Sequence, residues 1–489
     1  MIKSIVEIHW KPDKNSSKPA YLQIADYFIN RINSGEWAAG SFLPSQRDLA
    51  MRLKVNRSTA VAALEELKAV GLIETNGKGG TRVATRRRSV LNFMQPDWQA
   101  FIEDGIHKSN SNTIQIINRH ESVNDIIRLS SCEAPPELYP AETMAKVLAD
   151  VGGSIQNLGY EEPKGILYLR EQICSYLAEF GIKTTPSNVL IVSGAVQAIQ
   201  LISLGLLQPG SAVFIEKPSY LYSLNIFQSV GIRRCGIPMD SEGIIPEEIP
   251  HQKPKHRQSI LFTIPNFQSP TSIVMTEQRR KDLLTVCNRE QVPIVEDDVY
   301  RELWIDKRPP APIKSLDTTG TTLYVGSVSK TLSAGLRVGW VVGPEVVVDR
   351  LSDIKMQADY GTSSLAQHVV GRWMETGLYS EQNERIRKHI RLRRQVAMEA
   401  LQECFSDIAS WNVPEGGYFV WLEFHCPIRM GALFDEAFKS GILTYPGYLY
   451  DSSMNHCLRI SYSYAEIEDI RVGIRKLSEL ARKQIQKKR

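Results

Sequence analysis

The chain has 489 residues, of which 43% are hydrophobic and 23% are charged, as in soluble globular proteins. This length exceeds what one hydrophobic core organises and predicts two or three domains. No apolar run is long enough to cross a membrane, and the N-terminus lacks the pattern of a signal peptide, so we expect neither membrane insertion nor secretion.

The net charge of +4 is unevenly distributed along the chain. Residues 1–90 contain 15 Lys or Arg and 8 Asp or Glu, which gives +7, whereas the remainder contains 43 and 46, which gives −3. A basic N-terminal region favours a polyanionic partner. The seven cysteines are scattered and no two have metal-ligand spacing, so we expect reduced thiols in a cytoplasmic protein and no metal site.

Residues 15–85 predict three helices followed by a hairpin. Apolar residues recur at helical spacing from Tyr21 to Ile32. Residues 45–48 form a capping-box pattern at the start of a second helix, and a short turn leads to a third helix with an apolar face over 60–67. Two short strand-like runs then flank a glycine-rich tip at 76–80. This order is typical of a winged helix-turn-helix.

Residues 86–125 are expected to form a linker with one short helix around Trp98 to Ile106. From residue 126 to 489, apolar strand-like runs alternate with longer amphipathic helices, which predicts an α/β domain with a mostly parallel sheet. The clearest runs are 189–192, 212–215, 259–262, 293–295 and 322–325.

Three motifs near the N-terminus carry a specific resemblance: Leu43-Pro-Ser-Gln-Arg-Asp-Leu-Ala50, Val55-Asn-Arg-Ser-Thr59, and Gly71-Leu-Ile-Glu74 before the glycine-rich tip. Together they resemble the GntR type of winged helix-turn-helix. The resemblance implies that the third helix enters the major groove of double-stranded promoter DNA, N-terminus first. The residues expected at the bases or phosphates are Arg47, Asn56, Arg57, Ser58, Thr59, Lys78 and Arg82.

Lys330 lies in the run Gly326-Ser-Val-Ser-Lys-Thr-Leu-Ser-Ala-Gly-Leu-Arg-Val-Gly-Trp340. A lysine among small hydroxyl and glycine residues, with Arg337 seven positions later, suits an imine with an aldehyde cofactor whose phosphate needs an anchor. The last 360 or so residues resemble the aminotransferases of fold type I in the order of their motifs. That resemblance implies the cofactor pyridoxal 5′-phosphate.

The resemblance also assigns roles around the cofactor ring. Lys330 matches the lysine that forms the Schiff base, and Asp297 matches the carboxylate that faces the pyridine nitrogen. Tyr300 matches the phenol that binds the ring oxygen, and Tyr220 matches the aromatic side chain that stacks on the ring. Taken singly, the tyrosines could be core residues and Asp297 a helix cap; the shared order favours cofactor binding.

Phosphate and subunit contacts follow from the same resemblance. The backbone amides of Ala195 and Val196 would face the phosphate at a helix N-terminus. Ser327 and Arg337 match the side chains that complete this anion site. Tyr160 matches a residue that the neighbouring subunit usually contributes, which implies a homodimer.

Arg459 matches the arginine that binds a substrate carboxylate, with a strand-edge salt bridge as the alternative. Three nearby positions depart from the pattern. Ser269 replaces an asparagine that contacts the ring oxygen, Ser272 replaces a glycine, and Cys132 stands where a glycine would let backbone approach the effector carboxylate. These departures leave imine formation possible and weaken the case for fast transamination.

The two halves in this order resemble the MocR/GabR family of bacterial regulators, whose aminotransferase-like domain acts as a sensor in a head-to-tail dimer. The resemblance implies a transcription regulator that senses an amine, an amino acid or pyridoxal phosphate itself by imine exchange at Lys330. Two alternatives stay open: an active aminotransferase with an accessory DNA-binding domain, and a DNA-binding protein whose second domain binds no cofactor. The effector and the operator are not predictable from the sequence.

Overall fold

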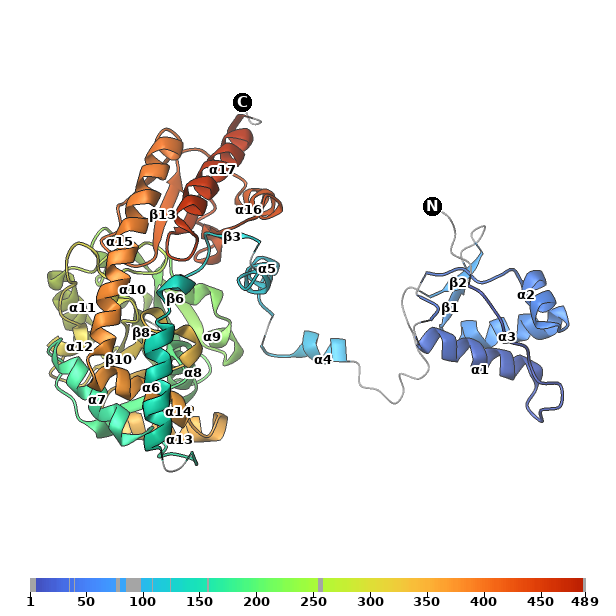
Figure 1. Ribbon diagram of the computed structural model, residues 1–489, viewed down its shortest axis with the longest axis horizontal. Coiled ribbons are helices and arrows are strands. Elements are labelled where there is room, and N and C mark those ends of the chain that lie inside the picture. The colour runs from blue at the N-terminus through green and yellow to red at the C-terminus, as the bar shows by residue number, and fades with distance from the viewer. Residues whose placement is uncertain are drawn as a thin grey trace. The chain divides into compact units, whose positions relative to one another are not determined.

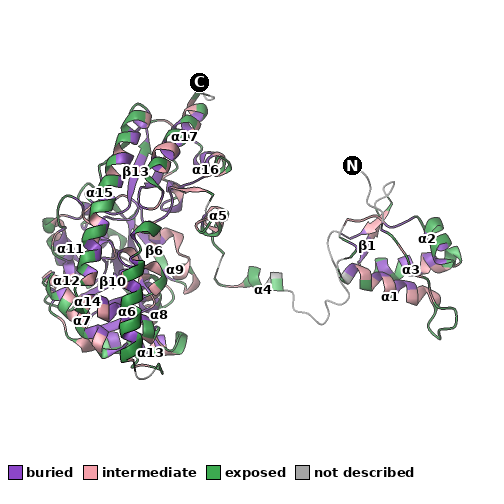
Figure 2. Ribbon diagram, in the orientation of Figure 1, coloured by how far each residue is buried: buried purple, intermediate pink, exposed green. Residues whose placement is uncertain are grey.

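The computed structural model describes residues 6–34, 36–38, 40–75, 80–84, 98–107, 109–123, 125–155, 158–253 and 258–486. The chain divides into two compact units, Met1–Gly105 and Ile106–Arg489 (Figure 1). Buried residues gather inside each unit, and exposed residues cover the outer faces of the helices (Figure 2). Each unit therefore has a core of its own. No helix in these described ranges is long and apolar enough to cross a membrane.

The first unit contains the predicted three helices and hairpin. Its elements are α1 (Ala20–Asn33), α2 (Gln46–Leu53), α3 (Arg57–Ala69) and the antiparallel pair β1 (Ile73–Thr75) and β2 (Thr81–Val83). The Ser45 hydroxyl accepts a hydrogen bond from the Asp48 amide, so the predicted cap of the second helix is confirmed. The core of this unit begins before residue 15, because Val6 is buried and Trp10 stacks on Tyr27 with ring centroids 4.6 Å apart.

The large sheet of the second unit has eight strands in the order β4-β11-β10-β9-β8-β5-β6-β7. Strands β10, β9, β8, β5 and β6 pair in parallel, whereas β11 runs antiparallel to both of its neighbours and β7 antiparallel to β6. The mostly parallel sheet and all five predicted runs are thus confirmed. The bounds are β4 (Val189–Val192), β5 (Ala212–Lys217), β6 (Arg233–Asp240), β7 (Gly243–Ile244), β8 (Ser259–Thr263), β9 (Ile294–Asp297), β10 (Thr322–Ser327) and β11 (Gly339–Val342).

Helices cover both faces of this sheet, which explains why its strands are apolar throughout. Leu190 and Val192 pack with α8 and α13 on one face, whereas Val189 and Ile191 pack with α6, α7 and α14 on the other. The helices of this layer are α6 (Ala141–Ser154), α7 (Leu167–Ala178), α8 (Ala195–Leu206), α9 (Ile226–Ser229), α10 (Glu248–Gln252), α11 (Glu277–Glu290), α12 (Ile313–Leu316), α13 (Glu345–Ala358) and α14 (Ser364–Glu375).

A smaller subdomain completes the second unit. A four-stranded sheet of β12 (Ala409–Trp411), β13 (Phe419–Phe424), β16 (Cys457–Ser461) and β15 (Tyr445–Pro446) packs with α15 (Leu378–Phe405), α16 (Met430–Lys439) and α17 (Ile467–Gln486). Helices α15 and α17 lie side by side (Figure 1). Strands β14 (Ile442–Leu443) and β3 (Ile127–Arg128) form a separate parallel pair.

The segment expected as a linker, 86–125, contains two helices. One is α4 (Trp98–Asp104), at the position predicted for a short helix, and the other is α5 (Asn112–His120). Helix α5 belongs to the second unit, because Ile117 packs with Phe434 and Leu443 in a small apolar cluster. These partners lie more than 300 residues away in the sequence, so local pattern alone did not indicate this packing.

Candidate functional site

A cavity of about 430 Å³ opens where the large sheet meets the smaller subdomain. The carboxyl ends of parallel strands meet at one edge of a sheet, and this edge is where open α/β folds bind ligands. Asp297 ends β9 and Ser327 ends β10 at this edge. The structure places these predicted residues in the cavity wall: Lys330, Asp297, Tyr300, Tyr220, Ala195, Val196, Ser327, Arg337, Ser269, Arg459 and Cys132.

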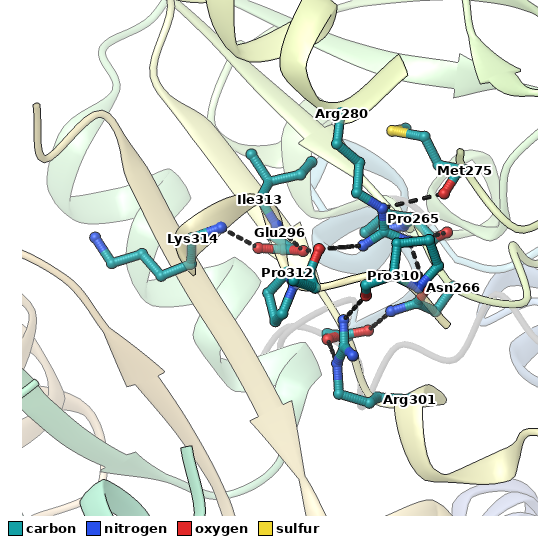
Figure 3. A network of polar contacts seen from close by, with 12 residues as sticks. Pro265, Asn266, Met275, Arg280, Glu296, Arg301, Pro310, Pro312, Ile313 and Lys314 are labelled. Atoms are coloured by element: carbon teal, nitrogen blue, oxygen red, sulfur yellow. Dashed lines mark hydrogen bonds and ion pairs between the residues drawn. The ribbon is translucent and has the colours of Figure 1, made fainter. Parts of the chain in front are cut away.

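Three consecutive carboxylates, Glu296, Asp297 and Asp298, are buried at the end of β9. Successive side chains of a strand point to opposite sides, so Asp297 faces away from its two neighbours. Figure 3 shows the polar network on the neighbours' side, where the Ile313 and Lys314 amides donate to Glu296 at 2.9 and 2.8 Å. Arg301, Asn266 and Tyr324 donate to Asp298. Both flanking carboxylates are therefore satisfied within the protein.

Asp297, in contrast, has one carboxylate oxygen that the protein leaves open. The Tyr220 hydroxyl donates to Oδ2 at 2.7 Å, whereas Oδ1 has no hydrogen-bond partner among the described residues. Only 4% of the residue is exposed, and burial raises its pKa to about 6, although the Tyr220 hydroxyl and the nearby Val299 amide oppose that rise. A buried carboxylate oxygen without a donor is costly, so this atom fits a cationic donor from a bound group, such as a protonated pyridine nitrogen.

The N-terminus of α8 is the predicted site for an anion. Gly194 has a φ of 90° and precedes the helix, whose first free amides are those of Ala195 and Val196. The Arg337 guanidinium donates to the Ser193 carbonyl at 2.8 Å. A Cβ at Gly194 would lie 2.4 Å from Nη2 of Arg337, so only glycine admits this close approach. Backbone amides and a guanidinium together suit a phosphate.

Ser329 is a cavity residue that sequence interpretation missed. Its hydroxyl lies 3.5 Å from Nη1 of Arg337 and 2.9 Å from Oγ of Ser327. The Ser327 hydroxyl also lies 2.9 Å from the Val338 carbonyl, so it supports the loop as well as lining the cavity. The signal was available, because Ser329 directly precedes Lys330 in the run of small hydroxyl residues.

The Lys330 amine is held inside the cavity by the short 3-10 helix η7 (Val328–Lys330). Nζ donates to the carbonyl of Cys132 at 3.0 Å and lies 5.7 Å from the centroid of the Tyr300 ring. The Tyr418 hydroxyl donates to the Lys330 carbonyl. Among the described residues no carboxylate forms an ion pair with this amine, which leaves it available for a ligand. Cys132 thus meets the lysine through its backbone.

Arg459 places a buried guanidinium on β16. Its side chain is 4% exposed, it donates to the Ser130 carbonyl, and its Nε has no partner among the described residues. Tyr445, Tyr450 and Phe419 surround the guanidinium with ring centroids 4.5, 5.6 and 5.1 Å from Cζ. The two tyrosines were not identified from the sequence. A buried guanidinium without a carboxylate partner fits an anionic ligand group.

The two serine departures have structural counterparts. Ser272 adopts a φ of 60°, in the left-handed region where the family pattern has glycine, at a cost of about 1 kcal/mol. Its hydroxyl donates to the Phe419 carbonyl at 2.6 Å. Ser269 is buried in the cavity wall, and its carbonyl accepts from the Tyr220 amide at 3.1 Å.

Tyr160 is the one predicted cofactor residue that this chain does not bring to Lys330. The residue is 85% exposed, and its ring lies 5.4 Å from that of Tyr360. Both line a second cavity of about 440 Å³, in which Lys355 and Asp359 form an ion pair. A contribution from a neighbouring subunit, as expected from the sequence, remains a prediction.

The predicted DNA-binding residues gather mainly at the N-terminus of α3. Arg57 and Ser58 are exposed and Thr59 is half-buried, and the Asn56 side chain makes no capping hydrogen bond. Arg47 is exposed on α2. On the wing, Nε of Arg82 forms a hydrogen bond of 2.7 Å with Glu74, whereas Lys78 lies outside the described residues.

Comparison with known families divides the chain as the structure does. Residues 20–83 match the family "Bacterial regulatory proteins, gntR family", and residues 124–477 match "Aminotransferase class I and II". YdfD of Bacillus subtilis strain 168, described as an uncharacterized HTH-type transcriptional regulator, is 46% identical over 95% of this chain and 97% of its own. The HTH-type transcriptional regulator NorG of Staphylococcus aureus strain N315 is 32% identical over 90% and 99%.

Solved structures resemble the second unit. Kynurenine aminotransferase from Pyrococcus horikoshii superposes with a TM-score of 0.75 at 29% identity, covering 80% of this chain and 99% of the enzyme. LysN, the α-aminoadipate aminotransferase of Thermus thermophilus, gives 0.72 at 28% identity and covers 80% and 100%. That structure holds N-(5'-phosphopyridoxyl)-L-leucine.

Proposed function

We infer the function of this chain from its membership of the MocR/GabR type of transcriptional regulators, in which a GntR-type DNA-binding domain precedes an aminotransferase class I/II domain. We propose that it binds pyridoxal 5′-phosphate and senses an amine or amino acid. The open oxygen of Asp297 carries this proposal. It is a buried acceptor without a donor in a cavity that also holds a lysine amine, a helix N-terminus with an arginine, and a buried arginine without an anion.

Each of these groups suits one part of the ligand. The amides at the start of α8 and the Arg337 guanidinium would hold the phosphate, and Asp297 would hold the proton on the pyridine nitrogen. When bound, pyridoxal phosphate supplies an aldehyde carbon that condenses reversibly with primary amines, so an effector amine can compete with Lys330 for it. Arg459 would bind the carboxylate of such an effector.

Signal transfer requires that the effector bind two states of the protein with different affinity. In one version the effector is an amine or amino acid, and in the other it is pyridoxal phosphate itself. In both, the DNA-binding domain places the N-terminus of α3 in the major groove, where Arg57 and Ser58 contact bases and backbone.

We further propose a cytoplasmic homodimer of the head-to-tail kind, in which Tyr160 completes the cavity of the partner. The support is its position, since an exposed tyrosine away from its own Lys330 is free to contact a second copy. Mixing Tyr160→Ala chains with Lys330→Ala chains tests this idea. Cofactor affinity should recover in the mixture, because one cavity of the mixed dimer has both residues; no recovery would contradict sharing between subunits.

The central experiment measures the visible absorption band of purified protein incubated with pyridoxal phosphate. We expect a band that is reducible by borohydride to a covalent adduct at Lys330 and absent from Lys330→Ala. Amines and amino acids are then screened for a shift of that band and for a change in operator affinity. A protein that stays colourless would refute cofactor binding, and a band that no amine shifts would refute amine sensing.

A catalytic role is the second candidate, and the presence of Lys330, Asp297 and Tyr300 in one cavity favours it. Steady-state turnover across amino donors decides between the two. Rates of about 1 per second or more would indicate an enzyme, since typical enzymes work in that range. The serines at 269 and 272 lead us to expect slower turnover.

A further inference from the structure

Two carboxylates in the cavity wall have no role in the ligand contacts described above. Asp297, Arg337, Lys330 and Arg459 account for the cofactor and an effector carboxylate. Glu121 and Glu133 also line the same cavity, and neither forms an ion pair with any described residue. Glu121 is half-buried, whereas Glu133 is exposed.

Glu121 is held close to the carboxylate-binding arginine. Its Oε1 accepts from the Ser130 hydroxyl at 3.4 Å, and the carbonyl of the same Ser130 accepts from Arg459. Its own carbonyl accepts from Arg128. Ser130 therefore links Glu121 to Arg459, so an effector whose carboxylate binds Arg459 lies near Glu121.

Helix α5 ends at His120, with Glu121 as its C-cap, and it is a fixed part of the cavity wall. Ile117 is 1% exposed and faces both the cavity and the apolar cluster of the smaller subdomain. The Thr113 hydroxyl lies 3.0 Å from that of Tyr448, and His120 packs edge-on against Phe438 at 4.7 Å. The carboxylate of Glu121 thus comes from a packed helix and needs little reorganisation to bind a ligand.

The charge balance at Glu121 favours a cation. Burial raises the pKa of this carboxyl group, the Arg459 and Lys330 charges oppose that rise, and Glu133 adds to it. Once a ligand carboxylate neutralises Arg459, the stronger of the two opposing cations is compensated. A half-buried carboxylate then lacks a partner, which an ammonium group on the ligand would supply.

We propose that Glu121 forms a subsite for a second ammonium group, so that the effector is a diamino acid rather than a neutral or dicarboxylic amino acid. This inference rests on the proposed function, because it assumes that an amino acid binds at Lys330 and Arg459. A charge-assisted hydrogen bond in a half-buried site should favour the diamino acid about tenfold in affinity over the analogue without the second amine.

The test compares L-lysine with L-norleucine and L-ornithine with L-norvaline, pairs that differ in the terminal amine, and includes L-glutamate. Binding to the cofactor-loaded full-length protein is measured by the shift of the visible band and by calorimetry. We expect wild-type protein to bind each diamino acid about tenfold more tightly than its neutral partner, and glutamate the least. Equal affinity within a pair would overturn the inference, and this comparison needs no variant.

Glu121→Gln should remove the difference within each pair and leave the affinity for norleucine within about twofold of wild type. The control is Glu133→Gln, an exposed carboxylate on the same cavity, for which we expect the difference to persist because solvent screens its charge. A difference that survives in Glu121→Gln, or that disappears in Glu133→Gln instead, would assign the selectivity elsewhere.

Amine sensing and the Glu121 subsite would fail in different ways. If the cofactor band forms and no amino acid of either kind shifts it, amine sensing is wrong and the subsite falls with it. If neutral and diamino acids shift the band equally, sensing stands and only the role of Glu121 is wrong.

Discussion

Replacing Asp297 by asparagine should make the cofactor-free protein more stable while weakening cofactor binding. Burial raises the pKa of Asp297 from its ordinary 3.8 to about 6. The folded state therefore holds the proton more tightly than the unfolded state. The stability that the protonated group contributes is complete below about pH 3.8 and is lost as the pH rises through about 6.

The size of the effect follows from these two pKa values. The folded and unfolded pKa values differ by about two pH units, and each unit corresponds to about 1.36 kcal/mol. The ionised carboxylate therefore lowers the free energy of unfolding by about 3 kcal/mol at pH 7.5 and by about half as much at pH 5. Asparagine has nearly the same shape and cannot ionise. With an unfolding entropy of about 2.1 cal/mol/K per residue, the second unit should melt about 4 °C higher in the variant at pH 7.5.

Differential scanning calorimetry of cofactor-free protein at both pH values checks this expectation. The variant should also bind pyridoxal phosphate about 10- to 100-fold more weakly, because a charged hydrogen bond is lost. The control is Asp298→Asn, which disturbs a carboxylate bonded to Arg301, Asn266 and Tyr324 and should destabilise the unit by about 3–5 kcal/mol. A lower melting temperature for Asp297→Asn at pH 7.5, or an equal gain at both pH values, would refute the reasoning.

Three further variants address the other contacts. Arg57→Ala should weaken operator binding by about 1–3 kcal/mol at matched salt and leave the cofactor band intact. The control Lys68→Ala, at the far end of α3, should have little effect on operator binding. Equal operator affinity of Arg57→Ala and wild type would contradict the placement of α3 in the major groove. Gly194→Ala should weaken cofactor binding without changing DNA binding, because its Cβ would displace Arg337; unchanged cofactor affinity would argue against the phosphate site. Lys330→Ala should bind DNA but give no effector response, and a full response would exclude exchange at this amine as the trigger.

Local sequence pattern was sufficient to predict the helices and strands whose buried faces appear directly in the spacing of their apolar residues. The helices and hairpin of the first unit follow helical and strand periodicity together with the Ser45 cap, and five strands of the large sheet follow from short apolar runs. The Lys330 run lies in a loop at the carboxyl end of a strand, and the parallel topology brings that end next to Asp297. Parallel pairing alone therefore places two of the predicted cavity residues at one edge of the sheet.

The contacts of some cavity residues could not be inferred from the sequence, because they depend on segments that lie far apart in the chain. Helix α5 was expected to be part of a linker because its polar residues resemble one, yet Ile117 finds apolar partners in the smaller subdomain. Tyr445 lies opposite Arg459 only because β15 pairs with β16, and Tyr450 follows at the end of the 3-10 helix η9 (Gly447–Leu449). Neither contact has a signal within a short sequence window.

The amino-acid sequence by itself determined the two-domain order, the winged helix and the mostly parallel sheet, and it predicted Lys330 as the Schiff-base lysine, because all of these rest on periodicity and on motifs within short windows. Only the tertiary structure decided which groups lack partners. Whether Asp297 has an open oxygen, whether Arg459 has a counter-ion and whether Glu121 faces the cavity depend on atoms from distant segments. Burial and hydrogen bonding are properties of the folded surroundings, and no residue type specifies them alone.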